Sequence, residues 1–169
     1  MIRFRATTIA DLDLLSYWDE QPHVVAASGE DGGFDWAFEL PRLFDWRELL
    51  IAEKDGRPIG FVQIIDPARE ESHYWGACEA GLRAIDVWLG EEADLGKGYG
   101  TKIMQAAVAR CFADPRVTAI IIDPLVSNER AHRFYERLGF RRVGRRVFAG
   151  VDDCFVYRLE RISGSGHGL

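Results

Sequence analysis

Alternating glycines in the middle of the chain could bind phosphate. The run Asp94-Leu-Gly-Lys-Gly-Tyr-Gly-Thr101 joins an apolar, β-branched stretch at 82–89 to an amphipathic stretch at 102–112. A glycine-rich turn between a strand and a helix leaves backbone N–H groups uncovered, and the first four of a helix have no partner within it. Together with the helix dipole, these groups attract anions. We therefore predict that residues 96–101 bind the phosphates of a cofactor.

Two common phosphate-binding patterns do not match this run. A P-loop needs Lys and then Ser or Thr after its last glycine, whereas here Lys97 lies between glycines and Thr101 follows the last one directly. The dinucleotide-binding pattern Gly-x-Gly-x-x-Gly has a wider final spacing than the three glycines at 96, 98 and 100. Two interpretations remain, an ordinary glycine-rich turn or a loop for the diphosphate of coenzyme A.

A second motif supports the coenzyme. After a strand candidate at 119–123 comes Asn128-x-x-Ala-x-x-x-Tyr135-x-x-x-Gly-Phe140, with apolar residues at helical spacing. This string and the segment 95–100 resemble two motifs of the GCN5-related N-acetyltransferases (GNAT), in which the diphosphate loop reads [QR]-x-x-G-x-[GA]. Gly98 and Gly100 take the glycine places, whereas Leu95 departs from the usual Gln or Arg. The resemblance covers roughly residues 79–148.

The resemblance implies that acetyl-coenzyme A is the cofactor and that its acetyl group passes directly to an amine. The glycine loop would bind the diphosphate, and the main chain at 87–89 would bind the pantetheine arm and polarise the thioester carbonyl. The residues expected to bind the cofactor are Val87, Trp88, Leu89, Leu95, Gly96, Lys97, Gly98, Tyr99, Gly100, Thr101, Asp123, Asn128, Ala131 and Phe134.

Three side chains are candidates for the chemistry of acetyl transfer. The resemblance places Tyr135 near the thioester sulfur, and a phenol with a pKa of about 10 is protonated at neutral pH and can donate to a departing thiolate. Asp86 interrupts an apolar strand, which is costly unless the carboxylate is paired or wet. It is a candidate for amine binding and general base catalysis, or it caps a backbone group. Glu79 lies seven residues earlier, so a bulge would be needed to align the two acids.

The blocks 79–86, 95–102 and 123–131 look more specifically like the aminoglycoside 6′-N-acetyltransferases. In that subgroup two acids at the places of Glu79 and Asp86 engage amines of the antibiotic, although the first is usually Asp. The resemblance therefore implies a cationic aminoglycoside acceptor, modified at its 6′-amine, and resistance to the drug. Tryptophan stacks on sugar rings but is also common in cores. The residues expected to contact the acceptor are Glu79, Asp86, Trp18, His23, Trp36 and Trp75.

Two other functions remain open at this point. The same cofactor loop would serve an acetyltransferase for another amine, such as a hydroxylysine siderophore precursor, a polyamine or a protein N-terminus. A non-catalytic module that binds acyl-coenzyme A is the more distant alternative, and the presence of Tyr135 together with two candidate acids argues against it.

Composition and net charge limit the classes of partner that the protein is expected to bind. The 169 residues carry a net charge of −6, which disfavours nucleic acid and suits a cationic substrate. No apolar run reaches the ~20 residues of a membrane helix, so we expect no membrane partner and a cytoplasmic location. The three cysteines, at 78, 111 and 154, show no metal-binding or disulfide pattern and are interpreted as packing residues. We expect a monomer or homodimer, with one domain at 1–162 and a disordered tail at 163–169.

The remaining pattern indicates an α+β protein. Strands are expected at 2–5, 46–54, 59–65, 79–89, 119–123, 142–148 and 154–159, with a hairpin turn at Asp55-Gly56. Helices are expected at 8–19, briefly from 35, at 102–112 and after Asn128, while 19–45 and 66–78 show no clear period. The GNAT resemblance implies a three-layer fold, with a central mixed, mostly antiparallel sheet that contains a splayed parallel pair and is flanked by helices.

Overall fold

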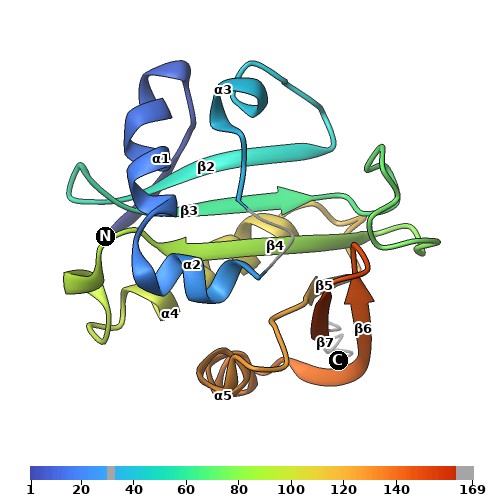
Figure 1. Cartoon of the computed structure of the whole chain (residues 1–169). Helices are drawn as coiled ribbons and strands as arrows, with labels where there is room; N and C mark the ends of the chain where they lie inside the picture. Colours follow the sequence, from blue (N-terminus) through green and yellow to red (C-terminus); the bar gives the residue numbers. More distant parts are fainter. Residues whose placement is uncertain (30–32, 163–169) are drawn as a thin grey trace, which may run out of the picture.

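A mixed sheet forms the centre of the computed structural model, which describes residues 1–29 and 33–162. Within this part of the chain the sheet has seven strands in the order β1-β2-β3-β4-β5-β7-β6. Figure 1 shows β3 and β4 side by side through the middle of the molecule. The strands are β1 (Ile2–Ala6), β2 (Arg47–Lys54), β3 (Arg57–Ile65), β4 (Leu82–Leu89), β5 (Ala119–Ile122), β6 (Arg141–Phe148) and β7 (Asp152–Glu160).

Helices cover both faces of the sheet and give the three layers that the resemblance implies. The neighbours Phe61 and Val62 of β3 show this, because their side chains belong to different apolar clusters. Phe61 packs with α1 and α3, whereas Val62 packs with α4 and α5. The helices are η1 (Ile9–Asp11), α1 (Leu12–Asp19), α2 (Pro22–Ser28), α3 (Trp36–Glu39), η2 (Glu92–Asp94), α4 (Tyr99–Phe112) and α5 (Glu129–Arg137). No helix in the described ranges is long and apolar enough to span a membrane.

The parallel pair β4–β5 separates partway along its length. Its register has only three pairs, from Leu82 opposite Ala119 to Ala84 opposite Ile121. Beyond this point β4 continues to Leu89 while still paired to β3, and β5 ends at Ile122. The side of β4 that faces β5 therefore lacks a strand partner from Ile85 onward. The fold class and the splayed parallel pair are confirmed.

Several element boundaries differ from those predicted. The central strand begins at Leu82 and not at 79, because Gly81 turns the chain with φ +88° directly over the Arg116 carbonyl. The predicted helix 8–19 is split into η1 and α1, and α2 lies in a segment to which the sequence assigned no element. The hairpin at Asp55-Gly56 is confirmed, with φ +50° and +81°. The expected tail at 163–169 lies outside the described residues.

Candidate acetyl transfer site

The glycine loop has the conformation that anion binding requires. Gly96 and Gly98 have φ of +74° and +81°, a region that residues with a Cβ rarely adopt. A Cβ at either position would meet no atom within 4 Å, so the space above the loop is open to a ligand. Gly98 is the N-cap of α4, and the N–H groups of the first turn therefore lack acceptors within the helix. These features fit the diphosphate of coenzyme A.

A cavity of about 510 Å³ opens where β4 and β5 separate. It is lined by residues of α1, α2, α3, β3, β4, β5, α5 and β7 and by the loop between β3 and β4. Within the described part of the chain, no Lys, Arg or His lines it. Six carboxylates do: Asp19, Glu39, Glu70, Asp86, Asp123 and Asp152.

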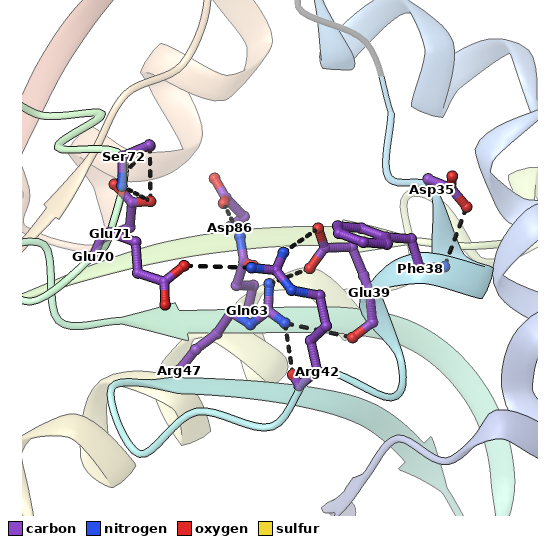
Figure 2. A network of polar contacts seen from close by, with 10 residues as sticks. All are labelled: Asp35, Phe38, Glu39, Arg42, Arg47, Gln63, Glu70, Glu71, Ser72 and Asp86. Carbon is purple, nitrogen blue, oxygen red and sulfur yellow. Dashed lines mark hydrogen bonds and ion pairs between the residues drawn. The ribbon is translucent and has the colours of Figure 1, made fainter.

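We call this cavity the acceptor cleft. Its negative charge is only partly balanced by basic side chains of the described residues. Arg47 donates to Glu39 over 2.6 Å, in the network drawn in Figure 2. In contrast, four of the acids form no ion pair with a basic side chain of the described residues, and these are Asp19, Glu70, Asp86 and Asp123. Carboxylates gathered in a concave, partly apolar site create a field that attracts cations. The cleft is therefore suited to a ligand with several positive charges.

Asp86 lies in the middle of β4 with its carboxylate in the cleft. Gln63, opposite it on β3 and 4% exposed, donates from Nε2 to Asp86 Oδ2 over 2.7 Å (Figure 2). Burial raises the pKa of the Asp86 carboxyl, and the Gln63 hydrogen bond offsets part of that rise. A carboxylate with a raised pKa is a stronger base near neutral pH than an exposed one.

Asp123 directly follows β5, and its carboxylate interacts electrostatically with that of Asp86 where β4 and β5 separate. Burial and then the charge of Asp86 raise the pKa of Asp123 to about 7. The indole N–H of Trp75 donates to Asp123 Oδ1 over 3.3 Å and favours its charged form. Two acids that interact in this way hold a proton between them near neutral pH, and an ammonium group bound there would favour its release.

Tyr135 completes the group on the side of α5. Its side chain lines the cleft and its residue is 8% exposed. Burial, with the nearby charges of Asp86 and Asp123, raises the pKa of the phenol above its ordinary value. The phenol is therefore protonated throughout the physiological range and can act as a hydrogen-bond or proton donor.

The structure brings some of the other predicted residues to this region. Asn128 caps α5, because its Oδ1 accepts from Ala131 N over 3.2 Å, and both residues line the cleft. Trp75 also lines it, as do Val87 and Trp88. Asn128 therefore caps the helix and lines the cleft at the same time.

Other predicted acceptor contacts lie elsewhere, and the expectation for them is corrected. Glu79 is exposed in the loop before β4 and pairs with Arg158 over 2.6 Å, so it does not join Asp86. Trp18 and Trp36 are 1% and 3% exposed in the apolar cluster beneath α1 and α3. His23 contacts the Leu89 carbonyl at 2.8 Å and does not line the cleft. Burial of indole area against the sheet outweighs exposure to a ligand at these positions.

Five acidic or amide residues of the cleft were not predicted from the sequence. One of them left a signal there, since Gln63 interrupts a buried apolar strand just as Asp86 does. The others lie on elements without a recognised pattern, or at an acidic turn that could equally be solvated. They are Asp19, Glu39, Glu70 and Asp152.

The raised pKa of Asp123 predicts an unusual dependence of stability on pH. Its ordinary pKa of 3.8 applies to the unfolded chain and about 7 to the folded one. The folded state therefore holds more protons between these values, and this residue's contribution to the unfolding free energy falls as the pH rises from 4 to 7. Asp123→Asn removes that contribution. The unfolding free energy of the variant, relative to that of the wild type, should therefore rise with pH by at most about 1.4 kcal/mol per pH unit.

Urea denaturation between pH 5 and 8 measures this difference. Asp114→Asn is the matched control, because Arg116 lowers the pKa of Asp114 to about 2 and its effect on pH dependence lies below this range. If the curves of Asp123→Asn and the wild type stay parallel from pH 5 to 8, Asp123 does not hold a proton in the folded protein.

Comparison with known proteins agrees with these features. The sequence profile of the acetyltransferase (GNAT) domain matches residues 7–148. The chain is 34% identical over 151 residues to aminoglycoside N(6′)-acetyltransferase type 1 of Klebsiella pneumoniae, covering 85% of this chain and 75% of that protein. It is 31% identical over 157 residues to lysine N-acyltransferase MbtK of Mycolicibacterium paratuberculosis, covering 83% of this chain and 65% of that protein.

A solved structure gives the same result in three dimensions. The structure of AAC(6′)-Ib in complex with paromomycin and acetyl-coenzyme A matches with a TM-score of 0.84 and 32% identity, over 95% of this chain and 93% of that one. A profile that spans most of the chain and a relative that shares both sequence and fold leave one conclusion. The chain belongs to the GNAT acetyltransferases and is an N-acetyltransferase that uses acetyl-coenzyme A, in the branch of the aminoglycoside N(6′)-acetyltransferases.

Proposed function

We propose that this protein transfers the acetyl group of acetyl-coenzyme A to the 6′-amine of an aminoglycoside and thereby confers resistance to it. The observation that carries the proposal is the acceptor cleft itself, which gathers six carboxylates and no basic side chain from the described residues around the open edge of β4. Aminoglycosides carry several ammonium groups on linked sugars, and a cleft of about 510 Å³ has room for more than one ring.

The proposed cofactor contacts follow from the fold. The N–H groups of residues 96–101 bind the diphosphate at the start of α4. The unpaired edge of β4 at Val87–Leu89 offers main-chain groups to the pantetheine arm, and Asn128 lies on the opposite side of the gap, at the start of α5. When bound, the cofactor supplies an activated acetyl group as a thioester.

The residues of the cleft would then perform three tasks. Asp86 and Asp123 bind the ammonium form of the amine and accept its proton, directly or through a water molecule. Positioning the neutral amine against the acetyl group supplies much of the rate enhancement. Tyr135, which stays protonated, donates a proton or hydrogen bond to the departing sulfur. Glu79 has no part in this proposal, because it pairs with Arg158 at the surface.

The location of the reaction follows from its cofactor. Acetyl-coenzyme A is supplied in the cytoplasm, and we propose that the transfer takes place there. The principal rival is an acetyltransferase for a simpler amine such as lysine, which is favoured by the similarity to lysine N-acyltransferase MbtK. A single amine would neutralise only part of the charge of the four cleft acids that form no ion pair with the described residues, so the charge of the cleft favours a polycation.

A pair of antibiotics tests the acceptor and the position of transfer together. Neomycin and paromomycin differ at one place, where neomycin has the 6′-amine and paromomycin a hydroxyl. Release of free thiol from acetyl-coenzyme A, with mass spectrometry of the product, should show turnover of neomycin, kanamycin and tobramycin and none of paromomycin. Paromomycin should instead inhibit the acetylation of neomycin competitively.

Lysine and spermidine serve as the rival acceptors in the same assay. Turnover of either one, with no aminoglycoside acetylated, would replace the proposed acceptor while leaving the acetyltransferase intact. Turnover of paromomycin at the same rate as neomycin would contradict the assignment to the 6′-amine.

A further inference from the structure

A buried carboxylate lies at the entrance to the diphosphate-binding loop. Asp94 ends η2, is 2% exposed, and is followed directly by Leu95 and the glycines. Arg57, the first residue of β3, donates from Nη1 and Nη2 to the two carboxylate oxygens of Asp94, each over 2.9 Å. Two parallel hydrogen bonds of this kind fix orientation as well as distance. The pair therefore joins the start of the loop to the β2–β3 hairpin.

The same hairpin also contacts the far end of the loop. The Lys54 ammonium, in the last residue of β2, lies 5.6 Å from the centre of the Tyr99 ring, and Tyr99 is the first residue of α4. A Cβ at Gly96 or Gly98 would touch nothing, so no side chain from elsewhere packs onto these positions.

The charge of Asp94 matters because the loop binds an anion. The Arg57 guanidinium, and to a lesser extent Lys97, keeps the pKa of Asp94 below its ordinary value, so the carboxylate is ionised at neutral pH. A buried negative charge directly before a diphosphate-binding loop would repel the ligand if it were left unpaired, since burial weakens the screening by water. Arg57 cancels that charge from the side of the hairpin, outside the glycine run.

We propose that Arg57 is a positioning residue for cofactor binding, which holds the loop entrance in place through Asp94 and neutralises that carboxylate next to the diphosphate-binding loop. The inference rests on the use of coenzyme A and is independent of which amine accepts the acetyl group. It predicts a loss of affinity that depends on the diphosphate, which a contribution to stability alone would not produce.

Isothermal titration with coenzyme A measures the effect without turnover. Arg57→Gln should raise the Kd by about tenfold or more, because the buried Asp94 carboxylate loses its charge-assisted hydrogen bonds. Asp94→Asn combined with Arg57→Gln removes the unpaired charge as well as the ion pair, so it should recover part of the lost affinity but not all of it. Arg110→Gln is the matched control, because it breaks a bidentate pair with Glu48 that lies away from the loop and should leave the Kd unchanged.

S-acetylpantetheine, which has no diphosphate, separates positioning from general destabilisation. Its kcat/KM should be the same in Arg57→Gln and the wild type, while kcat/KM for acetyl-coenzyme A falls. If Arg57→Gln does not fold, Arg57→Lys takes its place, because lysine retains the charge with a single donor group. Arg57→Lys should raise the Kd for coenzyme A several-fold and leave kcat/KM for S-acetylpantetheine unchanged. An unaltered Kd in the Arg57 variants, an equal loss for both thioesters, or a double variant as weak as Arg57→Gln would overturn the proposal.

Discussion

Replacing Asp86 with asparagine is expected to lower kcat by about 10²- to 10⁴-fold, the usual contribution of a general base. The substitution keeps the shape of the side chain and an oxygen that can accept from Gln63, so the strand should stay intact. What it removes is the charge and the basicity that burial strengthens. Steady-state kinetics with kanamycin should show the loss in kcat and a raised KM for the drug, with the KM for acetyl-coenzyme A nearly unchanged.

Glu79→Gln provides the contrast for this experiment. Glu79 has a carboxylate on the same segment of chain, but it is exposed and paired with Arg158. Its replacement should leave kcat within about twofold of the wild type, because exposed ion pairs contribute little. Equal activity in Asp86→Asn and the wild type would show that Asp86 is not the general base. A large loss of kcat in Glu79→Gln would show that Glu79 takes part in the reaction.

Replacing Tyr135 with phenylalanine is the second change with a large expected effect. It deletes one hydroxyl from a side chain that is otherwise packed against the rings of Phe134 and Phe140. If the phenol donates to the departing sulfur, kcat should fall by about 10²-fold, with KM values for both substrates little changed. Single-turnover measurements with rapid mixing would locate the loss in the transfer step itself.

Tyr157→Phe is the matched control, since its ring lies 6.4 Å from that of Tyr135. The Tyr157 hydroxyl donates to Glu136 and accepts from Arg142, both over 3.0 Å, and the residue is fully buried. Its loss should lower the melting temperature and leave kcat near the wild-type value. Tyr135→Phe should instead lower kcat and leave the melting temperature near the wild-type value. Full activity of Tyr135→Phe would exclude the phenol as the donor.

The local backbone of the proposed cofactor site was predictable because its information is local. Gly96 and Gly98 need positive φ, and Asn128 can cap a helix only from its own start. Each of these requirements concerns residues a few positions apart, so a single sequence carries it. The same holds for the hairpin at Asp55-Gly56, whose two residues adopt the expected turn.

The sequence was less informative about side chains whose roles depend on burial. Trp18 and Trp36 have the chemistry to stack on a sugar, yet both pack into the cluster beneath α1 and α3. Trp75, with the same chemistry, lines the cleft and donates to Asp123. Residue type could not separate these three, because the difference lies in which surface each indole meets after the sheet has formed.

The sequence by itself determined the glycine loop, the second helix motif and the isolated acid on the central strand. Only the tertiary structure decided the acceptor cleft. Its carboxylates come from α1, α3 and the β3–β4 loop, from β4 itself, from the residue after β5 and from the start of β7, and no common motif joins these segments. They meet because β5 lies between β4 and β7 and separates from β4 after three residue pairs. Strand order and its splay are properties of long-range pairing, and no spacing along the chain encodes them directly.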